Sequence, residues 1–104
     1  MGRKQKIRIL ERGQEQLTLD IDTWSEIIVV ISMFGWRPNR ISYSFLIRDT
    51  EVTNEEALEI SSAIKRIWEE AEKDPFKISS RIASVLPTLM DVCSFCLKGG
   101  FIIR

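Results

Sequence analysis

One segment of the chain is so apolar that the rest of the fold has to cover it. It extends from residue 24 to residue 34, and its apolar side chains recur at helical spacing or fill the positions between: Trp24, Ile27, Ile28, Val29, Val30, Ile31, Met33 and Phe34. A helix that is apolar almost all round is buried among other elements. The segment is well short of the ~20 apolar residues that span a bilayer. The sequence therefore predicts a central, covered helix and no membrane-spanning segment.

The two ends of this helix carry signals of their own. Thr23-Trp24-Ser25-Glu26 is a capping-box pattern, in which the Thr and Glu side chains satisfy free backbone N–H groups at a helix start. Gly35 suits the position just after a helix, and Pro38 cannot continue one. We therefore predict that the helix begins at Thr23 and ends before Gly35.

Three short runs predict the strands that cover this helix. Residues 6–10 and 16–21 flank a polar stretch that contains Gly13, which is typical of a hairpin. The second run alternates apolar and polar side chains, as a strand with one solvated face does. Residues 101–103 form a third apolar run, which suits a buried strand beside the hairpin.

A second helix has the clearest limits in the sequence. Thr53-Asn54-Glu55-Glu56 is another capping box, and Val52 is placed to pack on Ala57 as a hydrophobic staple. Apolar residues keep helical period from Ala57 to Ala71, with charged residues on the other side. Pro75 is expected to close this helix.

Two further segments are less regular. Residues 77–98 have a helical pattern, but Pro87 lacks the N–H that a helix interior needs, so either two helical pieces or one kinked helix is expected. In residues 36–52 the alternation of Ile41, Tyr43, Phe45 and Ile47 predicts a loop with a short strand.

These elements together predict the fold class. The chain is expected to be α+β and a single domain over residues 1–104, because its length suits one modest core. The N-terminal β-hairpin and the C-terminal strand form a small antiparallel sheet, packed against three to four helices.

Cys93 and Cys96 form a C-x-x-C motif. Residues three apart share one side of a helix, so the two thiols are placed to meet or to bind a metal together. A structural zinc site takes four ligands, however, and the chain has no histidine and no second cysteine pair. We predict that both thiols are buried, reduced and metal-free. The alternatives are a metal bridged between two chains or a redox sensor.

The sequence lacks the residues of the common catalytic sites. Without histidine, neither Ser-His-Asp nor Cys-His catalysis is available. Glu55-Glu56 and Glu69-Glu70 are adjacent rather than facing, as expected of a solvated acidic helix surface. Gly99-Gly100 precedes a strand, unlike the glycines of a phosphate-binding loop. We therefore predict that the protein is not an enzyme and uses no cofactor.

Residues 36–43 interleave aromatic and basic side chains. The candidate interaction residues in this stretch are Trp36, Arg37, Arg40 and Tyr43. Such a mixture suits stacking on nucleic-acid bases or anchoring a protein partner. The competing interpretation places the two aromatic side chains in the core and leaves the arginines on the surface.

Charge is balanced overall but not along the chain. Fifteen basic residues match fifteen acidic ones, so no net field attracts nucleic acid or anionic lipid. The first twelve residues are nevertheless basic, with Arg3, Lys4, Lys6, Arg8 and Arg12 against Glu11. Residues 49–59 are acidic. The basic N-terminus and the Trp36–Tyr43 loop support one alternative function, that of a nucleic-acid-binding protein.

Three groups of residues carry a resemblance to known sequences. They are Phe34-Gly35-Trp36-Arg37-Pro38, then Val52-Thr53-Asn54-Glu55-Glu56-Ala57, and finally the stretch from Phe95 to Ile103. In this order the chain resembles small uncharacterised bacterial proteins with a hairpin, a helix, GW-x-P, a capped helix and F-C-x-x-GGF-x-I. It differs from them at Asp49-Thr50-Glu51, where a glycine-containing turn is expected. The resemblance implies the same single-domain architecture and no known activity.

The function that follows is a non-enzymatic protein-binding or regulatory module. The catalytic residues are missing, and the chain has more large apolar residues than one small core needs. The expected partner is another protein, which includes a second copy of the chain in a homodimer. The absence of a signal-peptide pattern and the two closely spaced cysteines predict a cytoplasmic location.

Overall fold

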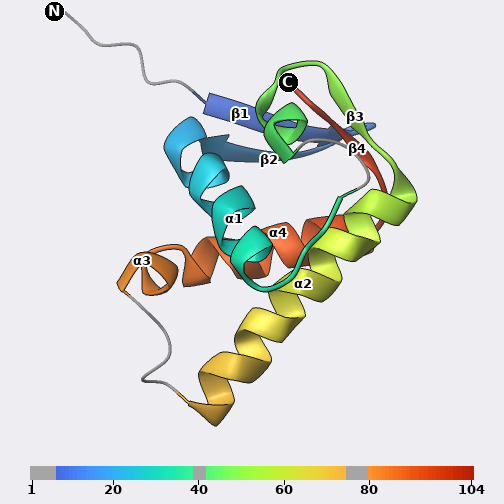
Figure 1. Ribbon diagram of the computed structural model, residues 1–104. Coiled ribbons are helices and arrows are strands. Elements are labelled where there is room, and N and C mark those ends of the chain that lie inside the picture. Colours follow the sequence, from blue (N-terminus) through green and yellow to red (C-terminus); the bar gives the residue numbers. More distant parts are fainter. Residues whose placement is uncertain (1–6, 39–41, 75–79) are drawn as a thin grey trace, which may run out of the picture.

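The computed structural model describes residues 7–38, 42–74 and 80–104 (Figure 1). In that part of the chain four antiparallel strands form one sheet in the order β2-β1-β4-β3. The strands are β1 (Ile7–Arg12), β2 (Glu15–Asp20), β3 (Thr50–Val52) and β4 (Phe101–Ile103). Figure 1 shows α1 (Ile21–Met33), α2 (Asn54–Lys73) and α4 (Leu86–Leu97) together on one side of this sheet. The predicted α+β class is thus confirmed.

The predicted hairpin and C-terminal strand are both present. β1 and β2 pair in register from Ile7 with Asp20 to Arg12 with Glu15, so the turn between them contains Gly13 at φ 60°. β4 lies between β1 and β3 and pairs with both. The sheet therefore has one more strand than the hairpin and the C-terminal run provide, and β3 is that strand.

The start of α1 differs from the prediction. The helix begins at Ile21 with Asp20 as its N-cap, so the capping box at Thr23 is wrong. Asp20 is also the last residue of β2, where it pairs with Ile7. The hairpin register and the burial of Trp24 fix this junction, so tertiary packing overrides the local capping pattern. The helix ends as expected, with Gly35 just beyond it at φ 95°.

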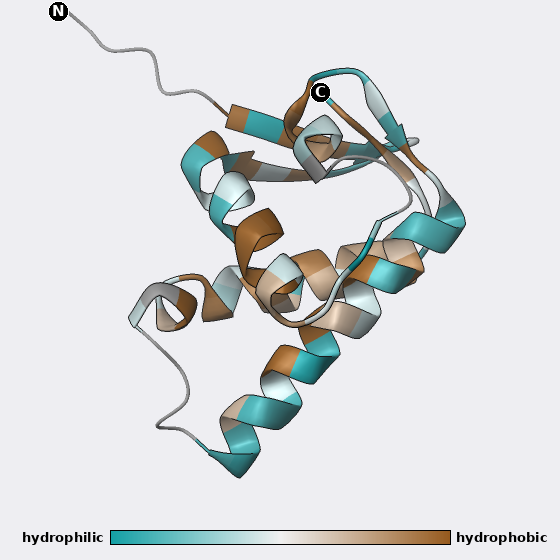
Figure 2. Ribbon diagram, in the orientation of Figure 1, coloured by the Kyte–Doolittle hydropathy of each residue, from teal (hydrophilic) through white to brown (hydrophobic). Residues whose placement is uncertain are grey.

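α1 is covered on one side and not all round. Trp24, Ile27 and Ile31 are fully buried, whereas Val29 is 40% and Met33 60% exposed. Figure 2 shows hydrophobic residues along this helix, in contrast to the hydrophilic far end of α2. The predicted central helix is therefore covered on one side, and its outer side is exposed.

α2 follows its predicted limits closely. The Thr53 Oγ1 accepts a hydrogen bond from the Glu56 N–H at 3.1 Å, and the Glu56 carboxylate accepts one from the Thr53 N–H at 3.0 Å. This reciprocal pair confirms the capping box. The helix ends at Lys73 with Asp74 as its C-cap, and the proposed stop at Pro75 lies outside the described residues.

Residues 42–46 form a 3₁₀ helix, η1 (Ser42–Leu46), where the alternating pattern predicted a strand. A loop with a short strand is present in this region, but the strand does not fall on the alternating residues, because Phe45 is buried and its carbonyl accepts a hydrogen bond from Trp24 Nε1 at 2.7 Å. Ile41 lies outside the described residues. The short strand occurs later, as β3, after Asp49 at φ 65°. That left-handed backbone is the kind a glycine adopts most easily.

The C-terminal helical segment is split rather than kinked. A short helix, α3 (Ser80–Ala83), precedes α4, and Pro87 is the second residue of α4. Proline is tolerated in the first turn of a helix because its missing N–H has no intrahelical partner there. Of the two predicted arrangements, two helical pieces is therefore correct. None of the helices in the described ranges has the length and hydropathy needed to span a bilayer.

Candidate functional site

The structure divides the predicted interaction residues between two surfaces. Trp36 is only 4% exposed, whereas Tyr43 is 66% exposed. Arg37 is exposed, and Arg40 lies outside the described residues. Trp36 borders a groove beside α2, and Tyr43 borders a hollow beside α1. The two aromatic side chains therefore do not form one stacking surface.

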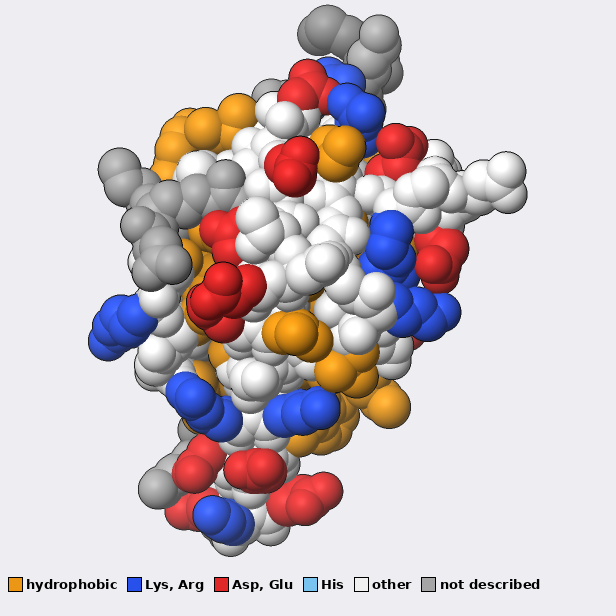
Figure 3. All heavy atoms as spheres, turned by 90° about the vertical axis from the view of Figure 1, so that its right-hand side faces the viewer, with side chains coloured by type: hydrophobic (Ala, Val, Ile, Leu, Met, Phe, Trp, Pro, Cys, Tyr) orange, Lys and Arg blue, Asp and Glu red, His pale blue; other side chains and the backbone are white. Residues whose placement is uncertain are grey.

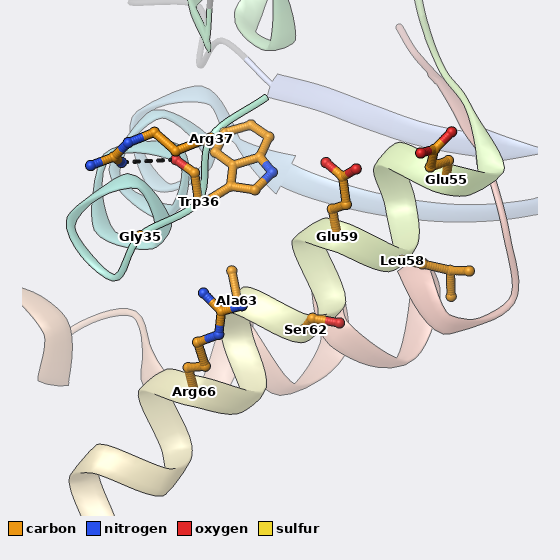
Figure 4. A pocket seen from close by; sticks show the side chains of 9 residues that line it. All are labelled: Gly35, Trp36, Arg37, Glu55, Leu58, Glu59, Ser62, Ala63 and Arg66. Atoms are coloured by element: carbon orange, nitrogen blue, oxygen red, sulfur yellow. Dashed lines mark hydrogen bonds between the residues drawn. The ribbon is translucent and has the colours of Figure 1, made fainter. Parts of the chain in front are cut away.

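The groove beside α2, called here the α2 groove, has a volume of about 550 Å³. It lies between the turn after α1 and the outer side of α2 (Figure 4). The residues that line it are Gly35, Trp36, Arg37, Glu55, Leu58, Glu59, Ser62, Ala63 and Arg66. Sequence reasoning singled out Trp36 and Arg37 as candidates but assigned the α2 residues to an ordinary solvated surface. Only the tertiary fold places the two sets opposite each other.

Charges of opposite sign occupy the two ends of the α2 groove. Figure 4 shows Glu55 and Glu59 toward the start of α2, and Arg66 further along the same helix near Gly35. The guanidinium Nη1 of Arg66 lies 3.5 Å from the position that a Cβ on Gly35 would take. Arg37 Nη1 donates to the backbone carbonyl oxygens of Trp36 at 3.2 Å and Ser32 at 3.3 Å. The groove is therefore polarised along the helix axis.

The indole of Trp36 is the buried polar group of this groove. Its ring packs edge-on against Phe45 with centroids 5.0 Å apart. Among the described residues, no acceptor is hydrogen-bonded to its buried Nε1–H. A buried donor left without a partner costs about 1–3 kcal/mol, and most buried Trp side chains avoid that cost. Figure 4 shows this nitrogen on the side of the ring that faces Glu59 and the groove.

The second surface, called here the α1–η1 surface, is apolar. It encloses a hollow of about 450 Å³ lined by Ser25, Ile28, Val29, Ser32, Met33, Tyr43 and Leu46. None of these side chains is charged. The Ser32 hydroxyl donates to the Ile28 carbonyl within the helix at 2.8 Å, so its hydrogen-bonding need is met without water. The outer side of α1 thus offers a surface that can be dehydrated at low cost.

Two arginines of the basic N-terminal stretch have structural roles. Arg12 donates to the carbonyl oxygens of Phe95 at 2.7 Å and Gly99 at 3.3 Å, and its guanidinium lies 4.2 Å from the centroid of the Phe95 ring. Arg8 donates to the Leu46 carbonyl at 3.2 Å. Hydrogen bonds from Lys98 and then from Arg12 lower the pKa of the Glu15 carboxyl. The other basic residues of this stretch, Arg3, Lys4 and Lys6, lie outside the described residues.

The two cysteines differ in their surroundings. Cys96 is fully buried, as predicted, but Cys93 is only half-buried, so the prediction is wrong for that residue. Cys93 lies on the side of α4 that faces α2, where its Sγ is 3.4 Å from the Ser61 Oγ. Burial, and next the neighbouring Cys93, raise the pKa of Cys96 to about 12. Within residues 7–38, 42–74 and 80–104, no three Cys, Asp or Glu side chains are placed to hold a metal ion.

This difference predicts selective thiol labelling of the folded protein. A soluble disulfide reagent at neutral pH should modify Cys93, whereas Cys96 should react only on unfolding, because it is buried and its thiol stays protonated. Counting released chromophore in buffer and in denaturant measures both classes. Cys93→Ala should abolish the native reaction and Cys96→Ala should leave it intact. Equal native rates at both thiols would contradict the burial of Cys96.

Comparison of the chain with protein-family models, with curated proteins and with solved structures found no match.

Proposed function

We propose that the chain is a non-enzymatic protein-binding module and that its α1–η1 surface docks a second copy of the chain. The observation that carries this proposal is the exposure of large apolar side chains on that surface. Met33 is 60% and Tyr43 66% exposed, beside Val29 at 40%. Contiguous exposed apolar surface that borders a hollow is a frequent mark of a protein interface.

A second copy suits this surface because the surface is uncharged. In a two-fold symmetric dimer each residue of the interface meets the same patch on its partner. A charged patch would then face its own charge, whereas the α1–η1 surface has no charged side chain among the residues that line it. The rim can still supply polar contacts, since Tyr43 carries a hydroxyl.

The absence of histidine and the state of Cys96 support the non-enzymatic part of the proposal. The chain has no imidazole to act as a general base near neutral pH. The raised pKa of Cys96, about 12, makes its thiol a poor nucleophile.

Nucleic-acid binding, the alternative from the sequence, is less favoured by the geometry. Trp36 is buried, and Arg8 and Arg12 donate to backbone carbonyl oxygens. Figure 3 shows one face of the molecule on which acidic and basic side chains are interspersed. A gel-shift series at low salt tests this alternative directly.

Met33→Lys is expected to make the protein monomeric. The interface would contain the new charge twice, and dehydrating both charges should raise the dimer dissociation constant about tenfold or more. Sedimentation equilibrium across a concentration series measures this constant. Met90→Lys is the matched control, because Met90 has nearly the same exposure, 59%, but lies on α4.

Two results would contradict the proposal. One is a wild-type protein that stays monomeric at the highest concentration reached. The other is a dimer that Met90→Lys dissociates and Met33→Lys does not, which would move the interface to α4.

A further inference from the structure

We propose that the α2 groove binds an extended peptide segment of a partner protein. The segment's backbone carbonyl accepts a hydrogen bond from Trp36 Nε1. An acidic side chain of the segment pairs with Arg66, and a basic side chain pairs with Glu59 and Glu55. This site is separate from the α1–η1 surface, and the proposal does not depend on dimer formation.

Two buried indoles of the fold differ in their hydrogen bonding. Trp24 Nε1 donates to the Phe45 carbonyl at 2.7 Å, so the fold satisfies that donor internally. Trp36 packs on the ring of the same Phe45, yet its N–H has no acceptor in the described part of the chain. Its nitrogen faces the α2 groove (Figure 4). A buried donor that points into an open groove is one that a ligand can satisfy.

The charged side chains of the α2 groove are available to a ligand. In the described ranges Glu55, Glu59 and Arg66 take part in no ion pair with another side chain. Opposite charges at the two ends of a groove favour a ligand that carries the complementary pair. Single-sign ligands such as a phosphate or a polyamine would meet repulsion at one end. The groove therefore selects a ligand with a cation and an anion held apart.

The distance between those charges sets the length of the ligand. Seven residues of helix separate Glu59 from Arg66, which is about 10 Å of rise, and eleven separate Glu55 from Arg66, which is about 16 Å. A single amino acid is too short to place its ammonium and carboxylate so far apart. An extended chain rises about 3.3 Å per residue, so side chains at positions i and i+4 lie about 13 Å apart on one face. A peptide of about five residues matches the groove.

The probes are two blocked pentapeptides with three central alanines. One has lysine first and glutamate last, and the other has the reverse order. In a ¹⁵N–¹H correlation spectrum the indole N–H resonance of Trp36, assigned with Trp36→Phe, should move downfield on titration and saturate for one of the two orders. The resonance of Trp24 should stay in place, since its donor is already bonded.

The charge assignment is tested with matched variants on the same helix. Arg66→Gln and Glu59→Gln should each raise the dissociation constant of the preferred peptide about tenfold, the size expected for one charge-assisted hydrogen bond. Lys65→Gln and Glu69→Gln change neighbouring exposed charges outside the groove and should leave that constant unchanged. Met33→Lys should also bind the peptide normally.

Three outcomes would overturn the proposal. The first is no movement of the Trp36 resonance with either peptide at millimolar concentration in the folded protein. The second is binding that Arg66→Gln and Glu59→Gln leave unchanged. The third is an equal response to free lysine and glutamate, which would make the occupant a small molecule rather than a peptide.

Discussion

Gly100→Ala is expected to lower the free energy of unfolding by about 3 kcal/mol, because the fold leaves no room for a side chain at this position. A Cβ on Gly100 would collide with the backbone carbonyl oxygen of Val52. It would also lie 2.9 Å from the Thr53 carbonyl carbon and 3.0 Å from the Asn54 nitrogen. These are backbone atoms at the start of α2, where the capping box fixes their positions, so they cannot move aside cheaply.

Moving Gly100 away from these atoms to relieve the collision would also break a hydrogen bond. The Gly100 N–H donates to the Asn54 Oδ1 at 2.7 Å, and this bond ties the entry of β4 to the N-terminus of α2. Thermal unfolding followed by circular dichroism should show a fall in Tm on the order of 10 °C.

Gly13→Ala is the control for backbone conformation alone. Gly13 has φ 60°, but no heavy atom lies within 4 Å of a Cβ placed there. Its substitution should cost roughly 1 kcal/mol, the penalty for a left-handed non-glycine residue. If the two variants lost equal stability, the close approach of Gly100 to α2 would be refuted.

Gly99-Gly100 illustrates what the sequence could and could not predict. The sequence places the pair directly before a strand, and β4 does begin at Phe101. Its second role, to let the chain pass against the backbone of residues 52–54, depends on a contact across more than forty positions. No local pattern records such a contact.

The helices show the same difference between local signals, which the sequence records, and tertiary contacts, which it does not. α2 was predicted well because its signals, the Thr53 capping box and the period of Ile60, Ile64 and Ile67, are local. The start of α1 and the form of η1 were not, because Asp20 is held by its pairing with Ile7 and Phe45 by the hydrogen bond from Trp24. Tertiary contacts decide those elements.

The candidate site shows this limit most clearly. Trp36 and Arg37 stood out because aromatic and basic residues alternate there. Glu59 and Arg66 did not, since charged residues on the outer side of an amphipathic helix are the ordinary case. Their distinction is that Gly35 and Trp36 lie opposite them, which no spacing within α2 could reveal.

Trp24→Phe is expected to lower the free energy of unfolding by about 3 kcal/mol. The substitution removes part of a fully buried side chain and leaves a small cavity. It also removes the 2.7 Å hydrogen bond from Trp24 Nε1 to the Phe45 carbonyl oxygen, which is then left without this donor. Because that bond closes η1 against α1, the loss should also loosen the Ser42–Leu46 turn. Urea unfolding measures the total, and the exchange rates of amide protons in η1 report the local part.

Trp36→Phe separates these two contributions, because it makes the same change in ring size at a second buried position. Its N–H has no acceptor among the described residues, so the variant loses packing against Phe45 without losing a hydrogen bond. The expected cost is about 1 kcal/mol, part of which is offset by removing a buried unpaired donor. The difference between the two variants, about 2 kcal/mol, then reports the hydrogen bond that Trp24 loses together with the unpaired donor that Trp36 loses. Should Trp36→Phe prove as costly as Trp24→Phe, the Trp36 N–H must have an acceptor within the fold, and the α2 groove would lose the donor on which peptide binding depends.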